Sequence, residues 1–81
     1  MSTLAELPLH RDAVVRTVRV AAELAQWLAA VGLEPGVRVR VLRRAAFGGP
    51  LHVRTGEGEL AVDATLAGTV EVSDPTSADE P

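Results

Sequence analysis

Hydrophobic and polar residues alternate along several short stretches of the chain. The clearest is 37–41, where valines at every second position alternate with Arg38 and Arg40. The stretch 51–55 alternates in the same way, with His52 and Arg54 at its polar positions, and 69–72 repeats the pattern near the C-terminus. Successive side chains of a strand point to opposite faces, so each stretch predicts a strand with one face in a core and the other in water.

Two more strands complete the predicted sheet. Residues 12–20 are rich in β-branched side chains, which favours a strand, although the adjacent Val14 and Val15 leave its register open. Residues 59–62 form a short strand that returns after a tight connection at 56–58. The sequence therefore predicts five short strands.

Between the first two of these strands, residues 21–31 predict the one substantial helix. Leu24, Leu28 and Val31 follow an i, i+4, i+7 spacing that predicts a buried stripe, extended backwards by Val20, and we expect Trp27 to join this core rather than a contact surface. After the helix, Gly32 occupies the position of a left-handed cap, and Leu33 follows where such caps often make a hydrophobic contact. Pro35-Gly36 then predicts a turn.

Two single helical turns and a polar tail account for the rest of the chain. Thr3 and Glu6 fit a capping box, and Asp63 is placed to cap a turn that runs through Ala67 and ends at Gly68. Residues 73–81 are polar and acidic, and we expect a disordered tail after a domain of residues 1–72. The fold class predicted is all-β with a small helical insertion, as a five-stranded, partly open barrel with the helix packed at one opening.

Composition and charge exclude several classes of function. The 81 residues correspond to one domain, without cysteine to form a disulfide or a thiolate metal site. Eight arginines balance eight acids before residue 73, so the net charge of −3 comes from the tail, and nucleic-acid binding is not expected. No apolar run is long enough to cross a membrane and no signal peptide begins the chain, so we expect a cytoplasmic protein that does not insert into membranes.

The residues that carry chemistry do not form a catalytic or metal-binding pattern. His10 and His52 are far apart in the sequence, and His52 is expected to pair across the hairpin with Glu59 in solvent. The serines lie near the ends of the chain, without a histidine placed to activate them. We therefore expect no enzyme activity, no cofactor and no bound metal.

The loop at residues 43–50 is the best candidate for a partner-binding site. Its two arginines are either a solvated strand end, the expected arrangement, or contacts to an acidic partner surface. Phe47 is either an exposed binding anchor or a plug of the barrel end, the plug being the expected arrangement. The glycines and proline that follow allow a sharp backbone path. The partner-binding residues predicted are Arg43, Arg44, Phe47, Gly48, Gly49 and Pro50.

The order of these motifs resembles the FeoA family, small cytoplasmic partners of bacterial ferrous-iron uptake. The resemblance rests on the helix end and turn at 32–36, the alternating strand 37–41, the loop Gly48-Gly49-Pro50-Leu51, and the closing segments 60–62 and 70–72. The opening at 4–8 also fits the family, so about nine tenths of the chain is covered.

This resemblance implies an SH3-like barrel and a role in metal homeostasis. The first hypothesis is a non-enzymatic binding module, an accessory or regulatory partner that docks on the cytoplasmic domain of a membrane ferrous-iron transporter with a GTPase domain. The alternative is an accessory module that binds a metal-dependent transcriptional repressor, since similar SH3-like domains occur in such repressors. A third hypothesis, a direct metal chaperone, has the least support from the residues. The oligomeric state stays open.

Overall fold

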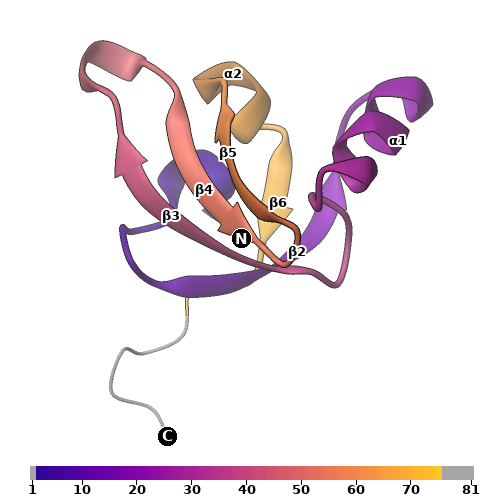
Figure 1. Ribbon diagram of the computed structural model, residues 1–81, viewed down its shortest axis with the longest axis horizontal. Coiled ribbons are helices and arrows are strands. Elements are labelled where there is room, and N and C mark those ends of the chain that lie inside the picture. The colour runs from indigo at the N-terminus through magenta and orange to yellow at the C-terminus, as the bar shows by residue number, and fades with distance from the viewer. Residues whose placement is uncertain (1, 76–81) are drawn as a thin grey trace, which may run out of the picture.

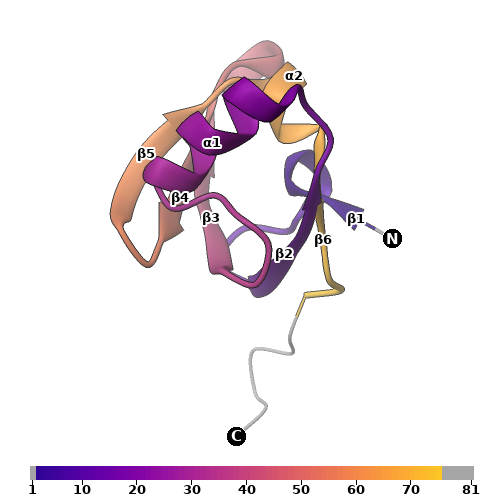
Figure 2. The ribbon, with the colours of Figure 1, turned by 90° about the vertical axis from the view of Figure 1, so that its right-hand side faces the viewer.

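The computed structural model describes residues 2–75, which fold into a curled, six-stranded sheet with short helices (Figure 1). The strand order is β1-β6-β2-β3-β4-β5 and all pairs are antiparallel. The sheet curves around the interior without closing, as the view in Figure 2 shows. The strands are β1 (Ser2–Thr3), β2 (Asp12–Val18), β3 (Arg38–Arg44), β4 (Leu51–Thr55), β5 (Gly58–Val62) and β6 (Val70–Val72).

The all-β class with one inserted helix is confirmed, but the count of five strands is wrong by one. The extra strand, β1, has two residues, Ser2 and Thr3, which pair with the end of β6. A two-residue strand is too short for any alternation to be visible in the sequence, because its position depends on the partner strand.

The alternation predicted for the strands is confirmed by burial. On β3 the valines at 39 and 41 are buried and Arg38 is exposed, while on β4 Leu51, Val53 and Thr55 are buried. In the first predicted strand, whose register the sequence left open, the side chains of Ala13 and Val15 point inward and that of Val14 points outward. One face of the sheet therefore covers the core and the other meets solvent.

The core is aliphatic and two single-turn helices help to close it. These are η1 (Leu4–Glu6), which buries Leu4, and α2 (Ala64–Ala67), which buries Ala67. Both predicted caps are present: a Glu6 carboxylate oxygen accepts from the Thr3 amide at 3.0 Å, and the Asp63 carboxylate accepts from the first amides of α2. The buried hydrophobic residues are Leu4, Leu7, Ala13, Val15, Leu28, Leu33, Val39, Val41, Leu51, Val53, Val62, Ala67, Val70 and Val72.

Helix α1 (Ala22–Ala30) lies where the sequence predicts it, but the face it buries is different. Only Leu28 of the expected stripe is buried; Leu24 and Val31 are exposed, and Trp27 is 74% exposed. The side chains that approach the sheet beside Leu28 are those of Ala25 and Ala29, both half-buried. An open hollow of about 380 Å³ lies between these two alanines and Arg16, Thr17 and Val18 of β2, so the helix does not pack tightly on the sheet here. The larger residues lie on the other side of the helix, in solvent.

The end of α1 is closed by the predicted left-handed cap. Gly32 has a φ of 98°, its amide donates to Ala29 O at 3.0 Å, and the Leu33 amide donates to Leu28 O at 2.8 Å. This pair of bonds is a Schellman motif, which brings the fully buried Leu33 back toward Leu28. The predicted Pro35-Gly36 turn follows, with Gly36 at a φ of 93° and the Val37 amide bonded to Glu34 O at 3.2 Å.

The start of the predicted tail is held against the sheet. The Ser73 amide donates to Val14 O at 2.9 Å, and the Ser73 hydroxyl accepts from the Val14 amide at 2.9 Å. The sheet pairing thus continues one residue past the expected boundary at 72. The rest of the expected disordered tail, residues 76–81, lies outside the described residues.

Candidate functional site

The loop after β3 carries its aromatic residue entirely outside the fold. It contains the short turn η2 (Ala46–Gly48), at whose centre Phe47 has a relative exposure of 106%. The expected plug of the barrel end is therefore wrong, because the ring contacts no core residue. The position of Phe47 instead fits the other arrangement that the sequence allows, in which the ring is exposed.

The backbone of this loop explains why the ring points outward. Phe47 (φ 59°, ψ 39°) and Gly48 (φ 73°) both have positive φ, and the Gly49 amide donates to Ala46 O at 3.2 Å, which makes 46–49 a type I′ turn. The Ala45 amide donates to Pro50 O at 3.0 Å and closes the base of the loop. A bulky residue in the left-handed region costs about 1–3 kcal/mol.

The two arginines of the candidate site have different roles. The Arg44 guanidinium donates to two backbone carbonyls of the N-terminal segment, Ala5 O at 2.9 Å and Leu7 O, and so ties η1 to the end of β3. Arg43 is exposed and makes no side-chain hydrogen bond or ion pair within residues 2–75. Arg43, Phe47 and Pro50, all exposed, are thus the predicted site residues with side chains available to a partner.

Replacing Arg44 by glutamine is expected to lower the free energy of unfolding by about 1–2 kcal/mol, since charged donors to two carbonyls are lost and one of these carbonyls is partly buried. Arg43→Gln removes the same charge from the adjacent exposed position and should change stability by less than about 0.5 kcal/mol. Urea unfolding of both variants measures the difference. Equal stabilities would show that the contacts of Arg44 do not stabilise the fold.

A second exposed apolar surface lies on α1. Leu24, Trp27 and Val31 are spaced i, i+3, i+7, so they share one face of the helix, and all three are exposed. In Figure 1 this helix stands at one end of the molecule and the loop of Phe47 at the other. The chain's only two aromatic residues therefore both lie at the surface, on separate elements.

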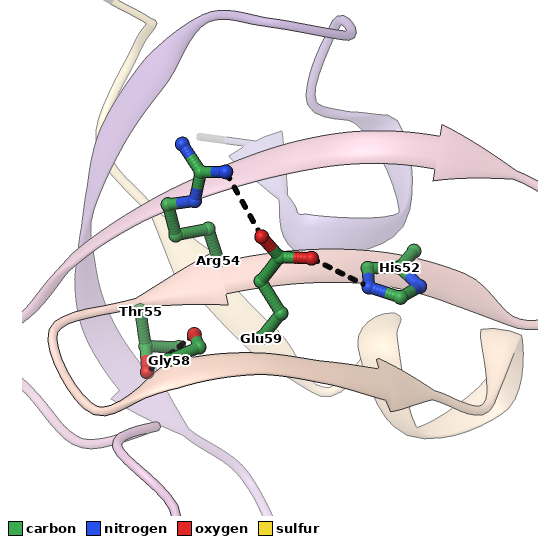
Figure 3. Close-up of polar contacts among 5 residues, drawn as sticks. All are labelled: His52, Arg54, Thr55, Gly58 and Glu59. Carbon is green, nitrogen blue, oxygen red and sulfur yellow. Dashed lines mark hydrogen bonds and ion pairs between the residues drawn. The ribbon is translucent and has the colours of Figure 1, made fainter.

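The outer face of the β4–β5 hairpin carries a charged cluster (Figure 3). The Glu59 carboxylate binds His52 Nε2 through one oxygen at 3.0 Å and Arg54 Nη2 through the other at 2.9 Å. The expected cross-strand pair of His52 and Glu59 is confirmed, and the contact with Arg54 is added to it. The hydrogen bond from Arg54, followed by that from His52, lowers the pKa of Glu59 below its usual value.

This lowered pKa sets the direction of a pH effect. The contribution of Glu59 to stability is present above the usual glutamate pKa and is lost as the pH falls through the lowered one. Arg54→Gln should raise the titration midpoint of Glu59, measured by NMR of its side-chain carboxyl carbon, because the larger cause of the shift is removed. Arg16→Gln, a charge change on β2, should leave that midpoint in place; an unchanged midpoint in Arg54→Gln would contradict the assignment.

Within residues 2–75, no three His, Asp or Glu side chains gather as a candidate metal site. His10 lies just before β2, where its backbone has a φ of 64° and its amide donates to Val41 O at 2.8 Å. None of the helices in this part of the chain is long and apolar enough to cross a membrane.

Three features of the site escaped the sequence reasoning. The first is the positive φ of Phe47. The sequence held one sign of it, the Gly48-Gly49 pair that follows, because type I′ turns favour glycine. The carbonyl contacts of Arg44 join segments nearly forty residues apart, which no local pattern shows. The outward position of Trp27 had a signal in the alanines at 25 and 29, which mark an alternative inward face of the helix.

Comparisons with known families and with solved structures both lead to FeoA proteins. The model of the FeoA domain family matches residues 2–74. FeoA of Stenotrophomonas maltophilia, solved in complex with zinc and described as a prokaryotic SH3 domain protein, is 35% identical, with 90% of this chain and 91% of that chain covered and a TM-score of 0.74. FeoA of Chlorobium tepidum is 28% identical, with 98% and 74% covered and a TM-score of 0.83.

Two further solved structures share this fold. An iron uptake regulatory protein, also a FeoA, is 28% identical, with 88% of this chain and 93% of that chain covered and a TM-score of 0.79. A manganese-dependent transcriptional repressor is 22% identical over 89% of this chain and 35% of its own, with a TM-score of 0.76, which shows a shared fold alone. A search of curated protein sequences finds no match. The match of the family model over 2–74, together with the SH3-like fold shared with solved FeoA proteins, shows that this chain belongs to the FeoA family.

Proposed function

We propose that this protein is a cytoplasmic, non-enzymatic accessory module that docks on the cytoplasmic domain of a ferrous-iron transporter. Membership of the FeoA family supports the setting, and the S. maltophilia relative is described as a candidate ferrous iron transport activating factor. The main partner surface is formed by residues 43–50, the end of β3 and the loop that follows it, with Phe47 as the anchor. The exposed face of α1, at the other end of the molecule, is a second contact surface.

One observation carries the proposal: Phe47 is fully exposed on a strained backbone. An exposed aromatic ring gains nothing for the folded monomer, and the left-handed backbone beneath it adds a cost. Aromatic side chains are among the residues that concentrate binding energy when a partner covers them. Arg43, exposed near the end of β3, supplies a positive charge on the strand that leads into the loop.

The experiment is an NMR titration of the isotope-labelled chain with the purified cytoplasmic domain of the ferrous-iron transporter encoded in the same genome. Saturable shifts at residues 43–50 and at 24–31 are the expected result. The absence of any shift, together with no co-elution of the two proteins, would contradict the proposal.

The alternative partner, a metal-dependent repressor, is the comparison arm of this titration. The likeness to a manganese-dependent repressor is one of fold only, at 22% identity, so nothing at the site favours it. Saturable binding to the repressor and none to the transporter domain would replace the first proposal with the second.

A further inference from the structure

A row of four charged residues crosses the outer face of the sheet, one on each of four neighbouring strands. The register places Asp12 opposite Arg40, Arg40 opposite Arg54, and Arg54 opposite Glu59. Like charges directly opposite one another, as at Arg40 and Arg54, are unfavourable. The two acids at the ends of the row offset this: Asp12 Oδ1 accepts from Arg40 Nε at 2.7 Å, and Glu59 Oε2 accepts from Arg54 Nη2 at 2.9 Å.

Arg38 adds an uncompensated positive charge beside this row. It is exposed, lies two residues before Arg40 on the same face of β3, and has no side-chain hydrogen bond or ion pair among the residues described. A hollow of about 380 Å³ opens here, with three arginines and a single carboxylate in its wall. The lining residues are Asp12, Arg38, Val39, Arg40, Arg54, Thr55 and Gly56.

The guanidinium groups around this hollow still have donors to offer. The ion pair of Arg40 uses Nε and that of Arg54 uses Nη2, so other N–H groups of both side chains stay free to bind an anion. Guanidinium groups suit carboxylates because they donate in a planar fork. The donors around the hollow therefore suit negatively charged oxygen atoms.

The spacing of the arginines indicates the form of the ligand. Residues i and i+2 of a strand are about 6.7 Å apart on one face, so the side chains of Arg38 and Arg40 leave the backbone of β3 at that interval. Carboxylates at alternate positions of an extended peptide have the same interval. We propose that this hollow binds an extended acidic protein segment with Asp or Glu at every second position.

Two other ligands fit the hollow less well. A single phosphate is held by one or two guanidinium forks and makes no use of a row of donors that runs along the strand, so it gains less from this hollow than a segment with two carboxylates. A nucleic acid needs an excess of positive charge over a wide surface, whereas arginines and acids balance over residues 1–72. The hollow also lies at the end of β3 and β4 opposite to the loop of Phe47, so this inference goes beyond the proposed docking on the transporter.

The test uses blocked pentapeptides titrated into the labelled full chain at low salt and followed by NMR. The first probe has glutamates at positions 2 and 4 and threonine elsewhere; the second has the same composition with adjacent glutamates, and the third has glutamines. Shifts at residues 38–40 and 54–56 are expected with the alternating peptide, which should bind about threefold tighter than its isomer. Equal binding of the two isomers, or tighter binding of inorganic phosphate, would overturn the proposal.

Variants locate the site. Arg38→Glu replaces an attraction by a repulsion and should weaken binding of the alternating peptide about tenfold. Arg43→Glu makes the same change of net charge at the far end of β3 and should weaken it by less than about twofold. Equal losses in the two variants would show unspecific attraction and overturn the site, and Arg38→Gln gives the same comparison if the reversed charge disturbs folding. No transporter is present in this experiment, so its outcome is independent of the proposed docking.

Discussion

Replacing Gly32 by alanine is expected to lower the free energy of unfolding by about 3 kcal/mol. Gly32 has a φ of 98°, where an added Cβ costs about 1–2 kcal/mol. That Cβ would also lie 2.4 Å from Thr55 Oγ1 and 3.0 Å from Thr55 Cβ, and overpacking of this kind costs about 1–3 kcal/mol. For a domain of this size the loss corresponds to a fall in Tm of about 15 °C.

The neighbour of Gly32 cannot move aside easily. Thr55 is 7% exposed at the tip of the β4–β5 hairpin. Its hydroxyl oxygen lies 3.4 Å from Gly58 O, and it accepts from the Glu57 amide at 3.1 Å. A shift of Thr55 would break these contacts, so the cap of α1 and the hairpin tip hold each other in place.

Gly36→Ala separates the two contributions. Gly36 has nearly the same φ, 93°, but a Cβ there meets no atom within 4 Å. This variant should therefore lose only about 1–2 kcal/mol from backbone strain. Thermal and urea unfolding of both variants gives the difference, which measures the contact with Thr55. Equal losses at the two positions would show that the hairpin tip yields to the new methyl group.

These glycines also show what a sequence can predict. Gly32 after an alanine-rich helix, and Gly36 after a proline, are local signals, because a positive φ depends on the turn alone. The strand faces follow from period-two alternation in the same local way. The chain's cap, turn and core valines were therefore predictable from neighbouring residues.

Features that depend on distant segments were not predictable in this way. The inward face of α1 depends on how the chain places the helix beside β2, which turns Leu28 and the half-buried Ala25 and Ala29 inward and leaves Trp27 outside. Arg44 donates to the carbonyls of the N-terminal segment because β3 ends beside η1, and this proximity is a consequence of the whole topology. The sharp loop at 46–49 was visible in its glycines, but the exposure of Phe47 was not, since the same residues also fit a plug of the barrel end.

Replacing Phe47 by glycine is expected to abolish most of the binding to the transporter domain, by about thirtyfold or more, if the proposed docking holds. A central aromatic anchor typically contributes at least about 2 kcal/mol to an interface. The same variant should leave the free energy of unfolding unchanged or raise it by up to about 1 kcal/mol, because no buried contact is lost and the strain at φ 59° is relieved.

This opposite effect on binding and stability distinguishes an anchor from a structural residue. Phe47→Leu is the matched control: it keeps an apolar side chain and the strained backbone, so stability should not change and binding should fall less than in the glycine variant. Calorimetric titration and urea unfolding measure the two quantities. A glycine variant that binds as tightly as the original chain would remove Phe47 from the interface, whereas a loss of more than about 1 kcal/mol of stability would show that the ring packs on the fold. The anchor requires both results together, because only a side chain that the monomer does not use is free to be covered by a partner.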